Sequence, residues 1–163
     1  MKKSIFLFIV IIGFVSFISA QTWQAPQRLT WDSEHSYVPV IAVGTGNDLH
    51  ITWTSKFSAN DIYYKKSTDS GSTWMGPKRL TWSSHSFSGQ DITIDGLNRV
   101  HIVFTDISVS TSDLFYKRSI DGGTTWDPLK RMTWTAGYKQ SACVEYDSFN
   151  NIYIIWSDST PRQ

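Results

Sequence analysis

A repeat of about 51 residues is the feature that most constrains what this chain can fold into. Three kinds of segment recur in one register along the chain. They are the Arg-x-Thr-Trp segments 28–31, 79–82 and 131–134, the apolar segments 49–53, 100–104 and 152–156, and the aromatic segments 61–67 and 113–119. Repeats of 20 to 50 residues are typical of units that stack on one another. The sequence therefore predicts an array of similar units and not one irregular core.

Each repeat contains up to four short segments of strand-forming residues, separated by Gly, Asn and Asp. The predicted strands are 40–43, 49–54, 62–66 and 78–82, then 92–94, 100–105, 114–118 and 130–134, then 142–146 and 152–157, with 27–31 as a lone copy of the fourth strand in front. Four-stranded units of this length are the blades of a β-propeller. We expect an all-β fold with blade repeats near 32–82, 83–134 and an incomplete third at 135–163.

The composition agrees with β structure and excludes several classes of protein. Aromatic residues make up 15% of the chain and charged residues 18%, and the formal net charge is +1. A chain of this kind is neither a charge-driven disordered segment nor a basic nucleic-acid-binding module. Cys143 is the single cysteine, so no disulfide forms within the chain and no zinc site built on paired cysteines is present. We expect Cys143 to be buried on a strand, and we predict no metal and no cofactor.

The first twenty residues have the layout of a secretory signal peptide. Lys2 and Lys3 precede an apolar run over 5–18, and Ser19 and Ala20 offer a small-residue cleavage site. The alternative is a membrane anchor, but the run is shorter than the roughly 20 residues of a spanning helix. We therefore expect cleavage before Gln21 and a secreted, extracellular or periplasmic, mature chain over 21–163 that keeps no membrane segment.

Two segments, 67–74 and 119–126, share the pattern Ser-x-Asp-x-Gly-x-Thr-Trp. This pattern resembles the Asp box, or bacterial neuraminidase repeat, of sialidase-like β-propellers. The resemblance implies a six-bladed ring of which this chain supplies about three blades. The residues that match it are Ser67, Asp69, Gly71, Thr73, Trp74, Ser119, Asp121, Gly123, Thr125 and Trp126. We interpret them as structural, because a residue that recurs in every blade supports the blade; the alternative is that the aspartates bind metal or catalyse.

Candidate binding residues lie in the loops from a fourth strand to the next first strand, where the internal copies differ most. In a propeller these loops share one end of the molecule with the loops between strands two and three. The candidate residues are Glu34, His35, Tyr37, His85, Phe87 and Tyr138. Mixed histidine, acid and aromatic side chains suit a carbohydrate or an extracellular protein, although variable loops can also be merely tolerant of change.

The resemblance to sialidases implies an arginine cluster, a Tyr–Glu nucleophile pair and an acid/base aspartate. Arg28 lacks the aromatic and proline neighbours of the family's first arginine, and it recurs in each repeat. Glu145 and Tyr146 are adjacent on a predicted strand, so they point to opposite faces. The sequence therefore favours a structural or ligand-binding propeller segment without catalytic activity of its own. The alternatives are the N-terminal part of a sialidase-type exo-glycosidase whose catalytic residues lie mostly beyond residue 163, and a receptor-type propeller that binds a protein.

The strand count predicts an open arc. The last repeat ends before its third strand, which leaves two apolar blade faces bare and the strand 152–156 as an exposed edge. We expect the remaining blades to come from a longer parent chain, or the faces to be covered by self-association.

Overall fold

The computed structural model describes residues 25–31, 35–56, 60–82, 85–107 and 112–159 as an all-β protein. Three antiparallel sheets contain all its strands, and each sheet is ordered as its strands occur in the sequence. The first sheet contains β1 (His35–Val43), β2 (Leu49–Lys56), β3 (Asn60–Ser67) and β4 (Lys78–Arg79). The second sheet contains β5 (Phe87–Ile94), β6 (Val100–Asp106), β7 (Leu114–Ser119) and β8 (Lys130–Arg131). The third sheet contains β9 (Lys139–Tyr146) and β10 (Ile152–Asp158).

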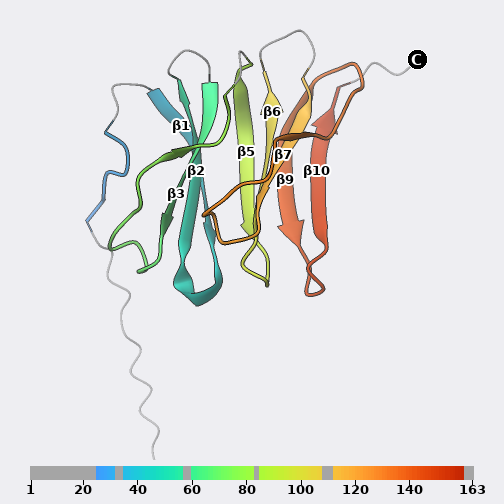
Figure 1. Cartoon of the computed structure of the whole chain (residues 1–163). Coiled ribbons are helices and arrows are strands. Elements are labelled where there is room, and N and C mark those ends of the chain that lie inside the picture. Colours follow the sequence, from blue (N-terminus) through green and yellow to red (C-terminus); the bar gives the residue numbers. More distant parts are fainter. Residues whose placement is uncertain (1–24, 32–34, 57–59, 83–84, 108–111, 160–163) are drawn as a thin grey trace, which may run out of the picture.

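The three sheets stand face to face in chain order (Figure 1). Apolar side chains fill the two spaces between them. Ile62 and Leu80 meet Ile92 and Phe104 between the first and second sheets. Val103 meets Val144 between the second and third sheets. The middle sheet is covered on both sides, which explains why every residue of β6 is buried.

The repeat extends to details of the backbone. The first strand of each sheet has a break in register at the same place, marked by Val38, Gly89 and Ser141 with positive φ angles of 52°, 61° and 52°. An extra residue of this kind bends a strand and increases its twist. Such agreement between copies shows that the repeated sequence specifies a repeated structure.

All ten predicted strands outside the N-terminal segment are present, but the fourth strands are short. β4 ends at Arg79 because Thr81 turns back, and its Oγ1 accepts a hydrogen bond from the backbone N–H of Ile62 at 3.0 Å. The prediction of a strand at 27–31 is wrong, since this segment has no strand pairing in the structure. It lies against the first sheet, where the Leu29 carbonyl accepts a hydrogen bond from Lys65 Nζ at 2.6 Å.

The outer faces of the first and third sheets expose apolar side chains whose counterparts in the middle sheet are buried. Ile41 and Val43 on β1 are 59% and 63% exposed, whereas the equivalent side chains Ile92 and Ile94 on β5 are 5% and 4% exposed. On the other side, Ile155 of β10 is 68% exposed. Its counterpart on β6, Val103, is completely buried against the third sheet.

A groove of about 420 Å³ lies on the outer face of the first sheet, between segment 27–30 and strands β1 and β2. Leu29, Ile41, Ile51 and Trp53 form its apolar lining. In the described part of the chain, no helix is long and apolar enough to cross a membrane.

Candidate functional site

The loops that hold the predicted binding residues lie at one end of the sheets. The ends of β2 and β6, after which the chain runs to the third strands, are at the top of Figure 1, and the β1–β2 turn is at the bottom. Hydrogen bonds between backbone groups join the two kinds of loop. Ile107 N–H donates to the Ser86 carbonyl at 2.7 Å within the second repeat, and Ser112 N–H donates to the Gly137 carbonyl of the third repeat at 3.3 Å. We call this end of the molecule the loop end.

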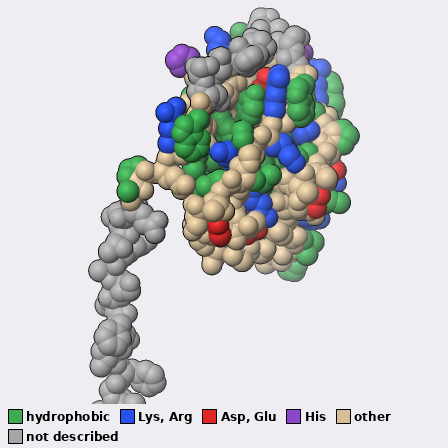
Figure 2. Space-filling view, turned by 60° about the vertical axis from the view of Figure 1, so that its left-hand side comes forward, with side chains coloured by type: hydrophobic (Ala, Val, Ile, Leu, Met, Phe, Trp, Pro, Cys, Tyr) green, Lys and Arg blue, Asp and Glu red, His purple; other side chains and the backbone are tan. Residues whose placement is uncertain are grey.

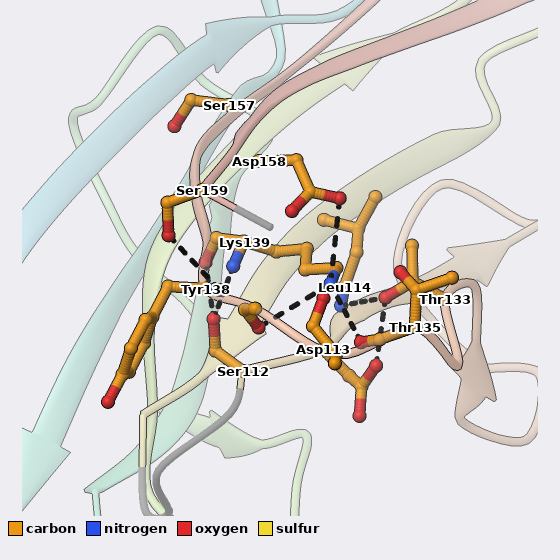
Figure 3. Close-up of polar contacts among 12 residues, drawn as sticks. Ser112, Asp113, Leu114, Thr133, Thr135, Tyr138, Lys139, Ser157, Asp158 and Ser159 are labelled. Carbon is orange, nitrogen blue, oxygen red and sulfur yellow. Dashed lines mark hydrogen bonds and ion pairs between the residues drawn. The ribbon is translucent and has the colours of Figure 1, made fainter. Parts of the chain in front are cut away.

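A buried lysine organises the loop end of the third sheet (Figure 3). The ammonium of Lys139 donates hydrogen bonds to the carbonyls of Thr135 at 2.8 Å and Ala136 at 2.7 Å, and it lies 3.5 Å from Asp158 Oδ2. Lys139 itself is completely buried. A buried charge is stable only when it is paired and hydrogen-bonded, so the loop carbonyls and the carboxylate hold each other in place through the ammonium. Lys139 was not predicted as a site residue, because a lysine at the start of a strand gives no signal of burial.

His85 contacts a carboxylate at the loop end of the second sheet. Its Nδ1 is hydrogen-bonded to Oδ2 of Asp106, and the imidazole is half exposed while Asp106 is buried. The ring also stacks on Phe87, with 6.2 Å between ring centroids. His85 is therefore held in one orientation with part of its ring open to solvent.

The other predicted binding residues have separate surroundings. His35 is exposed at the start of β1, and Tyr37 is half buried, which raises the pKa of its hydroxyl. Tyr138 is exposed, and its backbone exchanges hydrogen bonds with Ser159. Glu34 lies outside the described residues. The structure thus brings His85 to Phe87 and leaves Tyr138 in the loop before β9. His35 and Tyr37 lie on strand β1, so the expectation that they belong to a loop is wrong.

Phe87 lies inside the core and cannot be offered to a ligand. Its ring makes edge contacts with Phe104 and Phe115 at centroid distances of 5.2 and 5.4 Å. It is almost completely buried between the first and second sheets. Phe87 begins β5, so the loop expected to contain it ends earlier than the sequence pattern predicted.

The β3–β4 turn is built around one carboxylate. Asp69 accepts hydrogen bonds from Ser67 Oγ at 2.7 Å, from Thr73 N–H at 2.8 Å and from Thr73 Oγ1 at 2.6 Å. Gly71 has a φ of 89°, which an L side chain rarely adopts, and its carbonyl accepts a bond from Trp74 Nε1 at 3.1 Å. The hydroxyl and amide donors lower the pKa of Asp69 to about 2.

The β7–β8 turn repeats these bonds almost atom for atom. The equivalent residues are Ser119, Asp121, Gly123, Thr125 and Trp126. The pKa of Asp121 is again lowered to about 2, chiefly by the Thr125 hydroxyl. The two turns differ at the tryptophan: among the described residues, no hydrogen-bond partner is present for the buried Nε1 of Trp126. Each of these carboxylates is hydrogen-bonded within its own turn.

Tyr64 joins the first sheet to the β7–β8 turn of the second. Its ring packs edge-on against Trp126 at 5.0 Å, and its hydroxyl is hydrogen-bonded to His50 Nδ1 at 2.6 Å. A Cβ atom added to Gly123 would lie 2.0 Å from the Tyr64 oxygen. Burial raises the pKa of Tyr64 and lowers that of His50 to about 4. His50 is therefore neutral and serves packing between sheets.

Two of the three repeated arginines, Arg79 and Arg131, lie on strands and are each paired with an aspartate of the same sheet. Arg79 binds Asp61 at 2.6 Å, and Arg131 binds Asp113 in the same way. Arg28 donates from Nε to the Thr30 carbonyl at 2.6 Å.

The described residues contain no group of three or more His, Cys, Asp or Glu side chains arranged to hold a metal ion. The single cysteine, Cys143, is exposed on the outer face of the third sheet, so the expectation that it is buried is wrong. It alternates with Ala142 and Val144, which face the second sheet.

Comparisons of the sequence with protein families and with curated proteins do not assign the chain to a family. No protein-family profile matches the sequence. No curated protein matches it significantly.

Proposed function

We propose that the chain is a run of secreted, sialidase-like β-propeller blades with a structural or ligand-binding role and no catalytic activity of its own. The observation that carries the proposal is the contrast between equivalent apolar positions. Ile92 and Val103 are buried because another sheet covers them, while Ile41 and Ile155 occupy the same places on the outermost faces and are exposed. A surface with the composition of an inter-sheet contact is suited to receive another blade.

The repeated turns support the assignment to Asp-box propellers. In both copies the aspartate accepts bonds from a serine, a threonine amide and a threonine hydroxyl, and the glycine has a positive φ. Both turns follow the third strand of a four-stranded sheet and precede the fourth. This is where the resemblance places the Asp box.

The partners of the two outer faces are, in this proposal, further blades of a parent chain or a second copy of this chain. The loop end then presents the half-exposed His85 and the exposed Tyr138 to a carbohydrate or an extracellular protein. The arginines support a role without catalysis, because Arg79 and Arg131 are each bound to an aspartate of their own sheet and do not converge on a common point.

The proposal is tested by completing the third sheet. Asp158 corresponds to Asp106 in the repeat, so residues 107–134 can be fused directly after Asp158 to supply a third and a fourth strand. We expect the urea midpoint of unfolding to rise, because the fused strands cover the open edge of β10. A fusion of the same residues in scrambled order is the control. Equal midpoints for the two fusions would contradict the assignment of blades, and release of a fluorogenic sialoside by this chain would overturn the absence of catalysis.

A further inference from the structure

Each Arg-x-Thr-Trp segment ends in a tryptophan that is held at the surface. Trp31, Trp82 and Trp134 are 70%, 68% and 70% exposed. Tryptophan is highly buried on average, so three exposed copies at one repeat position require an explanation. Trp82 lies at the junction of two complete four-stranded sheets, so a missing neighbouring sheet does not account for its exposure.

A polar network fixes the backbone directly before Trp82. Asp61 accepts a hydrogen bond from an Arg79 guanidinium nitrogen at 2.6 Å and another from Thr81 Oγ1 at 2.7 Å. Arg79 Nε donates to the Thr81 carbonyl at 2.8 Å, and Thr81 Oγ1 accepts from Ile62 N–H. Asp61 and Thr81 are buried, so this network is part of the rigid sheet.

The same network precedes Trp134. Arg131 donates to Asp113 and, from Nε, to the Thr133 carbonyl at 2.9 Å. Thr133 Oγ1 donates to Asp113 Oδ1 at 3.0 Å and accepts from Leu114 N–H at 3.0 Å. Two copies with identical connectivity show that the presentation of the ring is specified by the repeat.

A cation lies beside each ring. The guanidinium carbon of Arg79 is 5.9 Å from the centroid of Trp82, and that of Arg131 is 6.0 Å from the centroid of Trp134. This contact orients the ring while leaving most of its area in solvent. On the side of the molecule that carries the first sheet, Lys and Arg side chains lie among hydrophobic ones (Figure 2).

The charges indicate the class of ligand. Each guanidinium is matched by its own aspartate, so the two sites have no excess charge to attract an anion. An exposed indole face packs well against the C–H groups of a sugar ring, because the partial positive charge on the C–H hydrogens faces the electron-rich face of the indole. The neighbouring guanidinium groups, which are partly exposed, can donate hydrogen bonds to hydroxyl groups.

We propose that Trp82 and Trp134 are two equivalent stacking sites for a neutral polysaccharide. Trp31 is an incomplete third copy: within the described ranges, the one hydrogen bond of the Arg28 side chain is to the Thr30 carbonyl, and the ammonium of Lys65 lies 5.6 Å from the ring centroid. A polymer that reaches both complete sites binds more tightly than a sugar at one site, by roughly 10²- to 10⁴-fold. The sites do not depend on whether the blades close into a ring.

Affinity electrophoresis in native gels that contain hydroxyethyl cellulose, xylan or galactomannan tests the proposal. We expect at least one of these polymers to retard the chain. Trp82→Ala and Trp134→Ala should each weaken the retardation about tenfold or more, and the double variant should abolish it. Leu97→Ala is the matched control, because Leu97 is an exposed apolar side chain in the β5–β6 turn at the opposite end of the sheets.

Two further variants and one further probe keep the result unambiguous. Trp82→Tyr and Trp134→Tyr preserve an aromatic face and should keep part of the binding, and urea midpoints show whether every variant is folded. Unchanged mobility of the native chain in all three gels would overturn the proposal, as would equal retardation of the native chain and a folded double alanine variant. Co-sedimentation with phosphatidylcholine vesicles without retardation by any polymer would replace it with a membrane-surface role.

Discussion

Replacing Gly123 by alanine tests the contact between the first sheet and the β7–β8 turn. Gly123 has a φ of 92°, and an added Cβ would lie 2.0 Å from the Tyr64 oxygen and 2.6 Å from its ring carbon Cζ. The positive φ costs an alanine about 1–2 kcal/mol. Displacing Tyr64, which is buried and bonded to His50, adds about 1–3 kcal/mol of overpacking. We therefore expect Gly123→Ala to lower the free energy of unfolding by about 2–5 kcal/mol.

Gly71→Ala is the matched control, because it carries the same backbone cost without the clash. Gly71 has a φ of 89°, and its added Cβ would meet the flexible Leu49 Cδ1 at 3.2 Å. We expect a loss of about 1–2 kcal/mol for this variant. Urea unfolding followed by tryptophan fluorescence measures both, provided that the m-values stay constant. Equal losses for the two variants would refute the contact.

A double-mutant cycle then assigns the difference to Tyr64. Tyr64→Leu removes the ring atoms nearest to the added Cβ, so part of the Gly123→Ala penalty should disappear in that background. We expect a coupling energy of about 1–3 kcal/mol. Additive losses would show that the penalty comes from the backbone alone.

Four further predictions rest on whether a side chain is buried, hydrogen-bonded or exposed. Phe87→Ala should cost about 3–5 kcal/mol in urea unfolding, because the ring is in the core, and a loss below 1 kcal/mol would place it in a loop after all. His50 has a folded pKa of about 4 against an ordinary value of 6.5, so its contribution to stability should be complete above pH 6.5 and be lost as the pH falls toward 4. Asp69 and Asp121 have folded pKa values of about 2 against an ordinary value of 3.8, so their contributions to stability should be lost only as the pH falls from about 4 to 2. Urea midpoints that stay constant from pH 8 to pH 3 would contradict both the histidine and the aspartate predictions. Cys143 should react with Ellman's reagent in the native chain, and reaction only after addition of urea would show that a partner covers it.

The strands were predictable because their residues recur in register, and the turn residues with positive φ were predictable because Gly71 and Gly123 occupy a repeated pattern. The absence of a strand at 27–31 was not predictable, because a strand forms only where another strand offers its edge, and the sequence pattern does not show that edge. In the structure the only polar contact that ties Leu29 to the first sheet is made by a lysine side chain, as far as the described residues show. The repeated sequence pattern is the same whether or not a neighbouring strand is present, so the pattern alone does not show whether a segment forms a strand.

The candidate site was harder to predict, because one structural position is filled by unlike residues. Phe87 and Lys139 occupy the same place in successive repeats, and both are buried at the start of a first strand. The phenylalanine packs among aromatic rings, whereas the lysine is surrounded by loop carbonyls. When the two repeats are compared in sequence alone, the unlike residues at this position suggest a variable loop. The three-dimensional structure shows that both side chains point inward from the same place.

Sedimentation velocity of the chain over residues 21–163, across a range of concentrations, tests the central claim that its two outer faces are blade contacts. The account predicts association that increases with concentration and that Val43→Glu and Ile155→Glu each weaken, because a charge is costly in an apolar contact. Leu97→Glu, an exposed apolar position in the β5–β6 turn and off both faces, should leave the association unchanged. A monodisperse monomer at every concentration, with the same sedimentation coefficient for the native chain and both face variants, would contradict the account.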